Sequence, residues 1–126
     1  MRLMGIDFGT KKIGIAFSDE SGVMAFPHSV VPNDQHLVQT VSILVREKKV
    51  DEIVIGHSLD KSGKENKVHE AVEGFITDLT LELGLPIHLE PEQYSTQQAL
   101  RIQGKTDKTD AAAAAIILDS FITRRK

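Results

Sequence analysis

The hydrophobic pattern of this chain changes its period once, near residue 32, and this change constrains the fold more than any other feature. Before it, apolar runs separated by turn residues predict three strands, at 3–8, 12–18 and 23–31. Pro27 lies inside the third run and predicts an edge strand or a bulge, because proline cannot donate a ladder hydrogen bond. A hairpin meander of this kind predicts an antiparallel start to a sheet.

After the change, apolar residues at steps of three and four alternate with short apolar runs. The first helix has Asn33 or Asp34 available as its cap. The expected helices are 37–48, 68–83, 95–103 and 110–123, and the expected strands are 53–56 and 86–90. Alternating helices and strands add parallel pairing to the meander. We therefore predict one α/β domain over 1–126, with a five-stranded mixed sheet flanked by helices.

Composition excludes several classes of function. The chain has no cysteine, which excludes a thiolate nucleophile, a cysteine-zinc site and a disulfide scaffold. Its longest apolar run, 111–118, is far shorter than the ~18 residues of a membrane span. A carboxylate at Asp7 interrupts the place where a secretory signal needs an apolar core. We therefore expect a cytoplasmic protein with no membrane partner.

Asp7 is the first candidate for chemistry. It lies near the end of an apolar strand that should be central, on the same face as Leu3 and Gly5. A carboxylate in that place costs free energy to desolvate unless it has a partner such as a metal ion. The alternative is structural, since an aspartate can open the turn at Phe8 and Gly9 by accepting a backbone hydrogen bond.

Two further acids can join it. Asp110 begins a helical stripe that continues through Ala114, Ile117 and Phe121, although it can also serve as a helix cap. Glu92 follows the last predicted strand, although Glu90 and Glu92 taken by themselves are both expected to be solvated loop charges. Acids after a first strand, after a later parallel strand and at a helix start can converge on one edge of an α/β sheet. Three carboxylates favour Mg²⁺ or Mn²⁺, and a pair of ions can support phosphodiester hydrolysis.

Basic residues recur in the loops expected near the same edge, although the net charge of the chain is −3. Such a distribution can follow a phosphate backbone despite an acidic total, and ordinary solvated charge is the alternative. The eight residues in question are Lys11, Lys12, Lys61, Lys64, Lys67, Arg101, Lys105 and Lys108.

Four segments resemble the motifs of the YqgF family, whose members are described as pre-16S rRNA nucleases or as Holliday-junction-resolvase-like proteins. The segment 5–19, GIDFGTKKIGIAFSD, is similar to the first motif of that family almost throughout. Residues 51–56 resemble its fourth strand, and Ser62-Gly63 sits in the loop that follows. Glu92 through Ser95, Thr96 and Ala99 resembles its late strand-to-helix motif, and 110–118 resembles its final helix.

The resemblance implies a ribonuclease-H-like fold and a metal-binding acidic site made of Asp7, Glu92 and Asp110. It implies processing of the 5′ end of pre-16S rRNA during ribosome biogenesis, with the small-subunit precursor as a partner. Its older alternative is a structure-selective nuclease acting on branched DNA. The expected nucleic-acid-binding residues are Thr10, Lys11, Lys12, Lys64, Ser95, Thr96, Arg101, Lys105 and Lys108.

The chain departs from the family pattern in its late loop. Gln93 stands where the family usually has arginine, which removes a charged phosphate contact. His57-Ser58 replaces the usual Leu-Pro, and the segment between Ser95 and Asp110 is shorter than usual. A nucleic-acid-binding module without turnover is therefore the second hypothesis. The segment 7–10 also resembles the phosphate loop of actin-like ATPases and sugar kinases, which need a second lobe.

Overall fold

The computed structural model describes residues 1–9, 11–57, 65–90 and 109–125, and every structural statement below concerns these residues. The strands are β1 (Leu3–Phe8), β2 (Lys12–Ser18), β3 (Ala25–Pro32), β4 (Glu52–His57) and β5 (Ile87–Leu89). The helices are α1 (Leu37–Lys48), α2 (Glu65–Leu83) and α4 (Thr109–Arg125). The predicted order of elements is confirmed. The helix expected at 95–103 lies outside the described residues.

The five strands form one mixed sheet in the order β3-β2-β1-β4-β5. β1 pairs with β2, and β2 with β3, in antiparallel fashion, whereas β4 is parallel to both β1 and β5. The expectation for Pro27 is confirmed in both forms: β3 is an edge strand, and its register with β2 shifts between Ile15 and Ala16. Antiparallel strands followed by parallel ones are the architecture that the change of period predicted.

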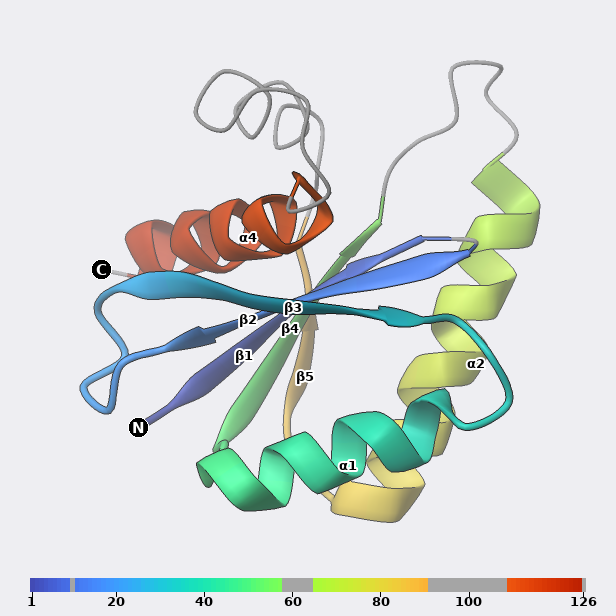
Figure 1. Ribbon diagram of the computed structural model, residues 1–126, viewed down its shortest axis with the longest axis horizontal. Helices are drawn as coiled ribbons and strands as arrows, with labels where there is room; N and C mark the ends of the chain where they lie inside the picture. Colours follow the sequence, from blue (N-terminus) through green and yellow to red (C-terminus); the bar gives the residue numbers. More distant parts are fainter. Residues whose placement is uncertain (10, 58–64, 91–108, 126) are drawn as a thin grey trace.

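Helices cover both faces of the sheet. α1 and α2 lie on one side and α4 lies on the other (Figure 1). The side chains of β1 alternate between the two faces, as those of any strand do. Met4, Ile6 and Phe8 belong to a core cluster that also contains residues of α1 and α2, whereas Leu3 belongs to a separate cluster with α4. Each face of the central strand therefore has its own apolar core.

The contact between α4 and the sheet is very close. A Cβ atom added to Gly5 would lie 2.7 Å from the carbonyl oxygen of Ala114 and 2.8 Å from the Cβ of Leu118. A Cβ added to Gly56 would lie 2.7 Å from Cδ1 of Ile117. Glycine in the strands and alanine in the helix therefore remove the side chains that would hold the two apart. The alanine run at 111–115 predicted such an approach.

Several boundaries differ from those expected. The cap predicted for the first helix is wrong, because α1 begins at Leu37 after His36, which makes no side-chain cap hydrogen bond. Asp34 instead accepts a hydrogen bond from the His36 backbone N–H at 2.9 Å, and the Asn33 amide donates to the Gly9 carbonyl at 2.8 Å. β3 begins two residues later than expected, and α2 begins at Glu65 rather than at residue 68. Within the described parts of the chain, no helix has the length and apolarity to cross a membrane.

Candidate acidic site at the carboxyl end of the central strand

Asp7 lies one residue before the end of β1, at the centre of the sheet. Its side chain belongs to the α4 face, and the residue is 8% exposed. Its register partners are Gly14 on β2 and Gly56 on β4, so neither neighbouring strand places a side chain beside the carboxylate. The strand prediction and the face assignment for Asp7 are confirmed. A buried carboxylate flanked by two glycines is a place where another element can approach closely.

The first turn of α4 lies toward the same end of β1. The carbonyl of Ala114 sits against Gly5, and Asp110 precedes Ala114 by four residues, which is ~6 Å along a helix. Asp7 follows Gly5 by two residues, which is ~7 Å along a strand. In Figure 1, α4 runs back toward the end of the molecule that carries both chain termini. The backbone of Asp110 is therefore displaced from the Gly5 contact in the same direction as Asp7.

The stripe predicted for α4 is confirmed where its side chains are described. Ala114 and Ile117 are buried against the sheet, and Phe121 is partly buried. The polar face carries exposed residues, namely Asp119, Thr123 and Arg124. For Asp110 the structure describes the backbone, so its assignment as a site residue stays a prediction.

Glu90 is an acid whose environment sequence reasoning missed. It was expected to be a solvated loop charge, which is wrong: the residue is 5% exposed. Its backbone N–H donates to the Ile55 carbonyl at 2.9 Å, which continues the pairing of β5 with β4 toward Gly56. Burial raises the pKa of the Glu90 carboxyl, and the Arg124 guanidinium, which forms an ion pair with it, opposes that rise. The signal for this burial was the alternation of β5, which places residues 88 and 90 on one face.

A second polar pair lies on the α4 face. Nε2 of His88 is 2.8 Å from Oε1 of Glu52, and the His88 ring lies 4.8 Å from that of Phe121. Glu52 is buried, whereas the His88 side chain is 36% exposed. The α4 face of the sheet therefore carries three buried carboxylates, Asp7, Glu52 and Glu90, each within a strand or next to one.

The other predicted site residues divide into two groups. Lys11 and Lys12 are exposed where β2 begins, directly after the end of β1. They therefore place positive charge beside the Asp7 end of the sheet. The following predicted residues lie outside the described residues: Thr10, Lys64, Glu92, Ser95, Thr96, Arg101, Lys105 and Lys108.

The donors expected for a metal are carboxylate oxygens, and these suit a hard divalent cation such as Mg²⁺ or Mn²⁺. Asp7 supplies such oxygens at the sheet edge where α/β folds place ligands. Among the described residues no three histidine, cysteine or acidic side chains form a metal-binding group. The side chains of Glu92 and Asp110, which would complete the predicted set, are not among them.

Comparisons with known proteins identify the family. A family model described as "RuvX: Holliday junction resolvase" matches residues 1–124. A relative in Maridesulfovibrio salexigens, called "Putative pre-16S rRNA nuclease", is 33% identical, with 98% of this chain and 99% of the relative covered. A relative in Mycoplasmopsis synoviae with the same description is 32% identical, with 97% of each chain covered.

Solved structures agree on the fold. RuvC of T. thermophilus, solved in complex with a Holliday junction substrate, superposes with a TM-score of 0.66 at 18% identity. That alignment covers 99% of this chain and 96% of the other. The Holliday junction resolvase of fowlpox virus superposes with a TM-score of 0.58 at 12% identity, with all of both chains covered. The predicted ribonuclease-H-like fold is confirmed in its RuvC-like form, and the chain belongs to the RuvX family, the YqgF family that its motifs resemble.

Proposed function

We propose that this protein is a metal-dependent nuclease that hydrolyses phosphodiester bonds and processes the 5′ end of pre-16S rRNA. The observation that carries the proposal is the buried Asp7 carboxylate at the end of the central strand, with the first turn of α4 directed to the same end. The name shared by the relatives supports the choice of substrate. The bacterial ribosome precursor would be the partner, and the reaction would take place in the cytoplasm.

Asp7, Glu92 and Asp110 are proposed as the catalytic and metal-binding residues. Two Mg²⁺ or Mn²⁺ ions held there would polarise the scissile phosphate and lower the pKa of an attacking water. Of the three residues, Asp7 has the most firmly fixed position, because β1 is paired on both sides and its backbone is held in the sheet. Asp110 would move only with α4, whose position is set by the contact with Gly5. No covalent intermediate with the protein is required.

The proposed nucleic-acid contacts begin at the same end of the sheet. Lys11 and Lys12 are exposed beside the end of β1 and can neutralise phosphates of a bound strand. We propose the same role for Thr10, Lys64, Ser95, Thr96, Arg101, Lys105 and Lys108. Phosphate contacts of this kind position a strand without reading its sequence.

Replacing Asp7 tests the proposal directly. Asp7→Asn keeps the size of the side chain but removes the charged metal ligand. Cleavage of a labelled 16S precursor fragment in Mn²⁺ or Mg²⁺ should fall by more than about 100-fold, since even outer-shell partners of metal ligands are worth about 10- to 100-fold. The midpoint of thermal unfolding should stay close to that of the wild type, because asparagine has nearly the same size and shape as aspartate.

The matched control is Asp119→Asn, which makes the same change on the exposed face of α4. It should cleave like the wild type, and EDTA should abolish cleavage by both. Turnover that is unchanged in Asp7→Asn, or that persists in EDTA, would contradict the assignment. Binding without cleavage under every condition would favour a module that has kept the fold and lost turnover.

A second candidate substrate is a four-way DNA junction. The description of the matching family model and the fold shared with RuvC favour it. Both substrates offer the same phosphodiester chemistry, so the Asp7 test cannot separate them. Cleavage of the 16S precursor and of a junction of matched length should therefore be compared at equal enzyme and metal concentrations. A preference for the junction would overturn the choice of RNA and leave the proposed chemistry intact.

A further inference from the structure

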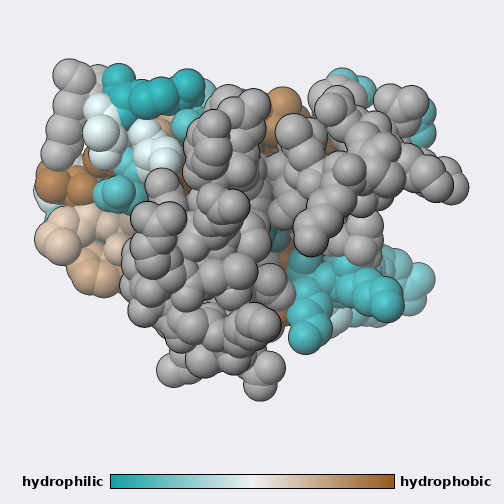
Figure 2. Space-filling model, turned by 90° about the horizontal axis from the view of Figure 1, so that it is seen from above, coloured by the Kyte–Doolittle hydropathy of each residue, from teal (hydrophilic) through white to brown (hydrophobic). Residues whose placement is uncertain are grey.

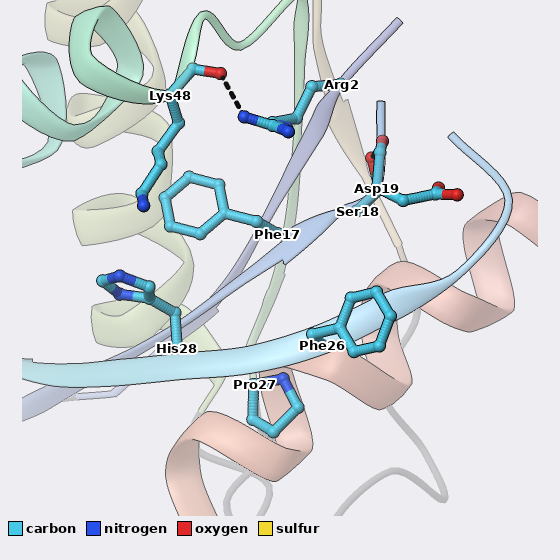
Figure 3. Close-up of a pocket in the computed structure, with 8 residues that line it drawn as sticks. All are labelled: Arg2, Phe17, Ser18, Asp19, Phe26, Pro27, His28 and Lys48. Carbon is cyan, nitrogen blue, oxygen red and sulfur yellow. Dashed lines mark hydrogen bonds between the residues drawn. The ribbon is translucent and has the colours of Figure 1, made fainter. Parts of the chain in front are cut away.

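A pocket lies at the opposite end of the sheet from Asp7 and on the opposite face. It has a volume of about 310 Å³ and is lined by Arg2, Phe17, Ser18, Asp19, Phe26, Pro27, His28 and Lys48 (Figure 3). Phe17 belongs to the core on the α1 and α2 side, whereas Asp7 faces α4. Arg2 and Asp7 are five residues apart along an extended chain, a separation of ~17 Å. The pocket is therefore distinct from the acidic site.

Aromatic rings form one part of the pocket. Phe17 and Phe26 are register partners on β2 and β3, and the His28 ring lies 4.9 Å from that of Phe17 in an edge-on arrangement. Phe26 is 50% exposed although it is a large apolar residue. Figure 2 shows that hydrophobic surface is present at the end of the molecule where Figure 1 places the connection between β2 and β3. An exposed ring beside a buried one offers a flat surface for stacking.

Positive charge forms the other part. In Figure 3 the Phe17 ring lies among Arg2, Lys48 and His28. Nζ of Lys48 is 6.0 Å from the centre of that ring, and Nη1 of Arg2 donates to the Lys48 carbonyl at 2.9 Å. Among the described residues, Nε of Arg2 is buried and has no hydrogen-bond partner. The Arg2 side chain as a whole is 27% exposed, so part of it is open to an anion in the pocket.

The lining also contains an acid, Asp19, which limits where an anion can bind. Asp19 accepts hydrogen bonds from the Ser21 hydroxyl at 2.7 Å and from the backbone N–H groups of Val23 and Met24. These bonds lower the pKa of Asp19 to about 2, so it stays negatively charged, and a bound phosphate would lie on the Lys48 side of Arg2, away from Asp19 (Figure 3). Glu20, the acid 3.8 Å from Arg2, has a side chain that is 93% exposed and can move into solvent.

We propose that this pocket binds one nucleotide of the single-stranded RNA substrate, with the base stacked on Phe26 and a phosphate held by Arg2 and Lys48. Flat aromatic surface next to cations is the chemistry that single-stranded nucleic acid requires. The volume is at the lower end of the range for small-molecule sites, which suits a single nucleotide. The inference rests on the proposed function, because it extends the path of the same substrate.

The path of such a strand is set by the position of β3. Because β3 is the edge of the sheet, RNA can pass around it from the face with the pocket to the face with Asp7. The separation along β1 alone, ~17 Å, corresponds to about five nucleotides at the ~3.4 Å spacing of a stacked strand, and the path around β3 is longer. RNA long enough to occupy both places should therefore depend on the pocket, whereas a very small phosphodiester should not.

Binding of a fluorescently labelled single-stranded 16S precursor fragment, measured by anisotropy in EDTA, tests the pocket without cleavage. Phe26→Ala should weaken binding about 5- to 10-fold, the lower part of the effect of losing one stacked base. Phe26→Tyr should restore it, because the ring is retained. Lys48→Ala should reduce the slope of log affinity against log salt by about 0.7, the value for one phosphate contact of a single strand.

The matched controls remove a cation and an apolar side chain at positions away from the pocket. Arg46→Ala removes a cation from the same helix turn, and Leu81→Ala removes an apolar side chain that is 81% exposed on α2. Both should bind RNA like the wild type. Equal RNA affinity for wild type, Phe26→Ala and Lys48→Ala would overturn the inference, and so would an effect of the controls as large as that of the pocket variants.

Hydrolysis of bis(p-nitrophenyl) phosphate with Mn²⁺ separates this inference from the proposed function. That small diester reaches the acidic site without spanning the pocket, so Phe26→Ala and Lys48→Ala should hydrolyse it at the wild-type rate. A loss of its hydrolysis in these variants would overturn the inference, because the pocket would then act on the chemistry itself. If hydrolysis depends on Asp7 but RNA affinity is unchanged in Phe26→Ala, the proposed nuclease function would stand and the inference about the pocket would be overturned.

Discussion

The two faces of the central sheet are built differently. The face under α1 and α2 is packed with large apolar side chains, among them Ile6, Ile13 and Phe75, all of them buried. On the face under α4, glycines in β1 and β4 meet the helix directly, and three carboxylates are buried on the same face. The layer under α1 and α2 is therefore filled by large apolar side chains, whereas the layer under α4 is closely packed and contains charged groups.

This difference in packing indicates that the layer under α1 and α2 mainly stabilises the fold, whereas the layer under α4 positions the acidic site. Large apolar side chains bury most area and so contribute most of the free energy of folding. A helix that sits directly on glycine has little freedom to shift, so it can hold an acid in a fixed place relative to Asp7. We therefore expect damage to the first layer to lower stability, and damage to the second to lower activity. The predictions below test that separation.

The largest loss of stability is expected from Leu79→Ala on α2. Leu79 is fully buried in the first layer. Truncating a buried leucine leaves a cavity, and the free energy of unfolding should fall by about 2–5 kcal/mol in urea titrations. Cleavage per folded molecule, measured well below the unfolding midpoint, should stay within a factor of two. A large loss of activity in the folded variant would break the separation of roles.

Gly5→Ala should lower the cleavage rate strongly and the free energy of unfolding less than Leu79→Ala does. The new methyl group would meet the backbone oxygen of Ala114, which cannot swing away as a side chain can. Overpacking of this kind typically costs about 1–3 kcal/mol in the free energy of unfolding. Because α4 must shift, Asp110 moves with it, and a displacement of ~1 Å can cost about 100-fold in rate. Single-turnover cleavage by the folded variant measures this loss.

Gly74→Ala is the matched control for that variant. It makes the same substitution in α2, where an added Cβ would meet nothing within 4 Å. The free energy of unfolding should rise by about 0.5–1 kcal/mol, because glycine is a poor helix former. Its cleavage rate should equal that of the wild type. Equal loss of activity in both glycine variants would show that the position of α4 does not matter.

Arg124→Gln should cause the smallest loss of stability, and the size of that loss should depend on pH. Glu90 has a raised pKa in the folded protein, so its ionisation lowers stability as pH rises above its ordinary value of about 4.5. Removing Arg124 raises that pKa further. The variant should lose about 1 kcal/mol at neutral pH, a modest value because the Arg124 side chain is 60% exposed to solvent. The loss should vanish below pH ~4.5, where Glu90 is protonated in both proteins.

Chemical unfolding at a series of pH values, in EDTA, measures this effect. Arg46→Gln is the control, since its pair with Glu82 is exposed on both sides. Its effect should be small at every pH. A loss in Arg124→Gln that is as large at pH 4 as at pH 7 would contradict an electrostatic origin and would point to lost packing of the arginine stem.

Most of the fold could be predicted from the sequence, because hydrophobic period is a local property. The strands at β1 and β2, the edge position of the strand with Pro27 and the buried stripe of α4 all follow from residue spacing. The cap of α1 could not be predicted in this way. Asn33 is a good capping residue, but its amide is used by the Gly9 carbonyl, a partner 24 positions earlier in the chain.

The acidic site likewise contains one residue that local sequence identified and one that it did not. Asp7 was identifiable because a carboxylate in an apolar strand is unusual, and its burial confirms that its environment is not ordinary. The alternation of β5 indicates the face on which Glu90 lies, but its burial was missed, because the helix that pairs with it there through Arg124 comes 34 residues later in the chain. The pocket between Phe26 and Lys48 was missed for the same reason, since its residues come from two strands and a helix end.

The sequence by itself determined the elements, their order, the face on which Asp7 lies and the small side chains that allow α4 to approach. These depend on neighbouring residues, whose preferences and spacing are written in the chain. Only the tertiary structure decided that Gly14 and Gly56 flank Asp7, that Glu90 is buried, and that cations meet aromatic rings at the C-terminal end of α1. Register and packing bring distant residues together, and their free energy belongs to pairs that no local pattern contains.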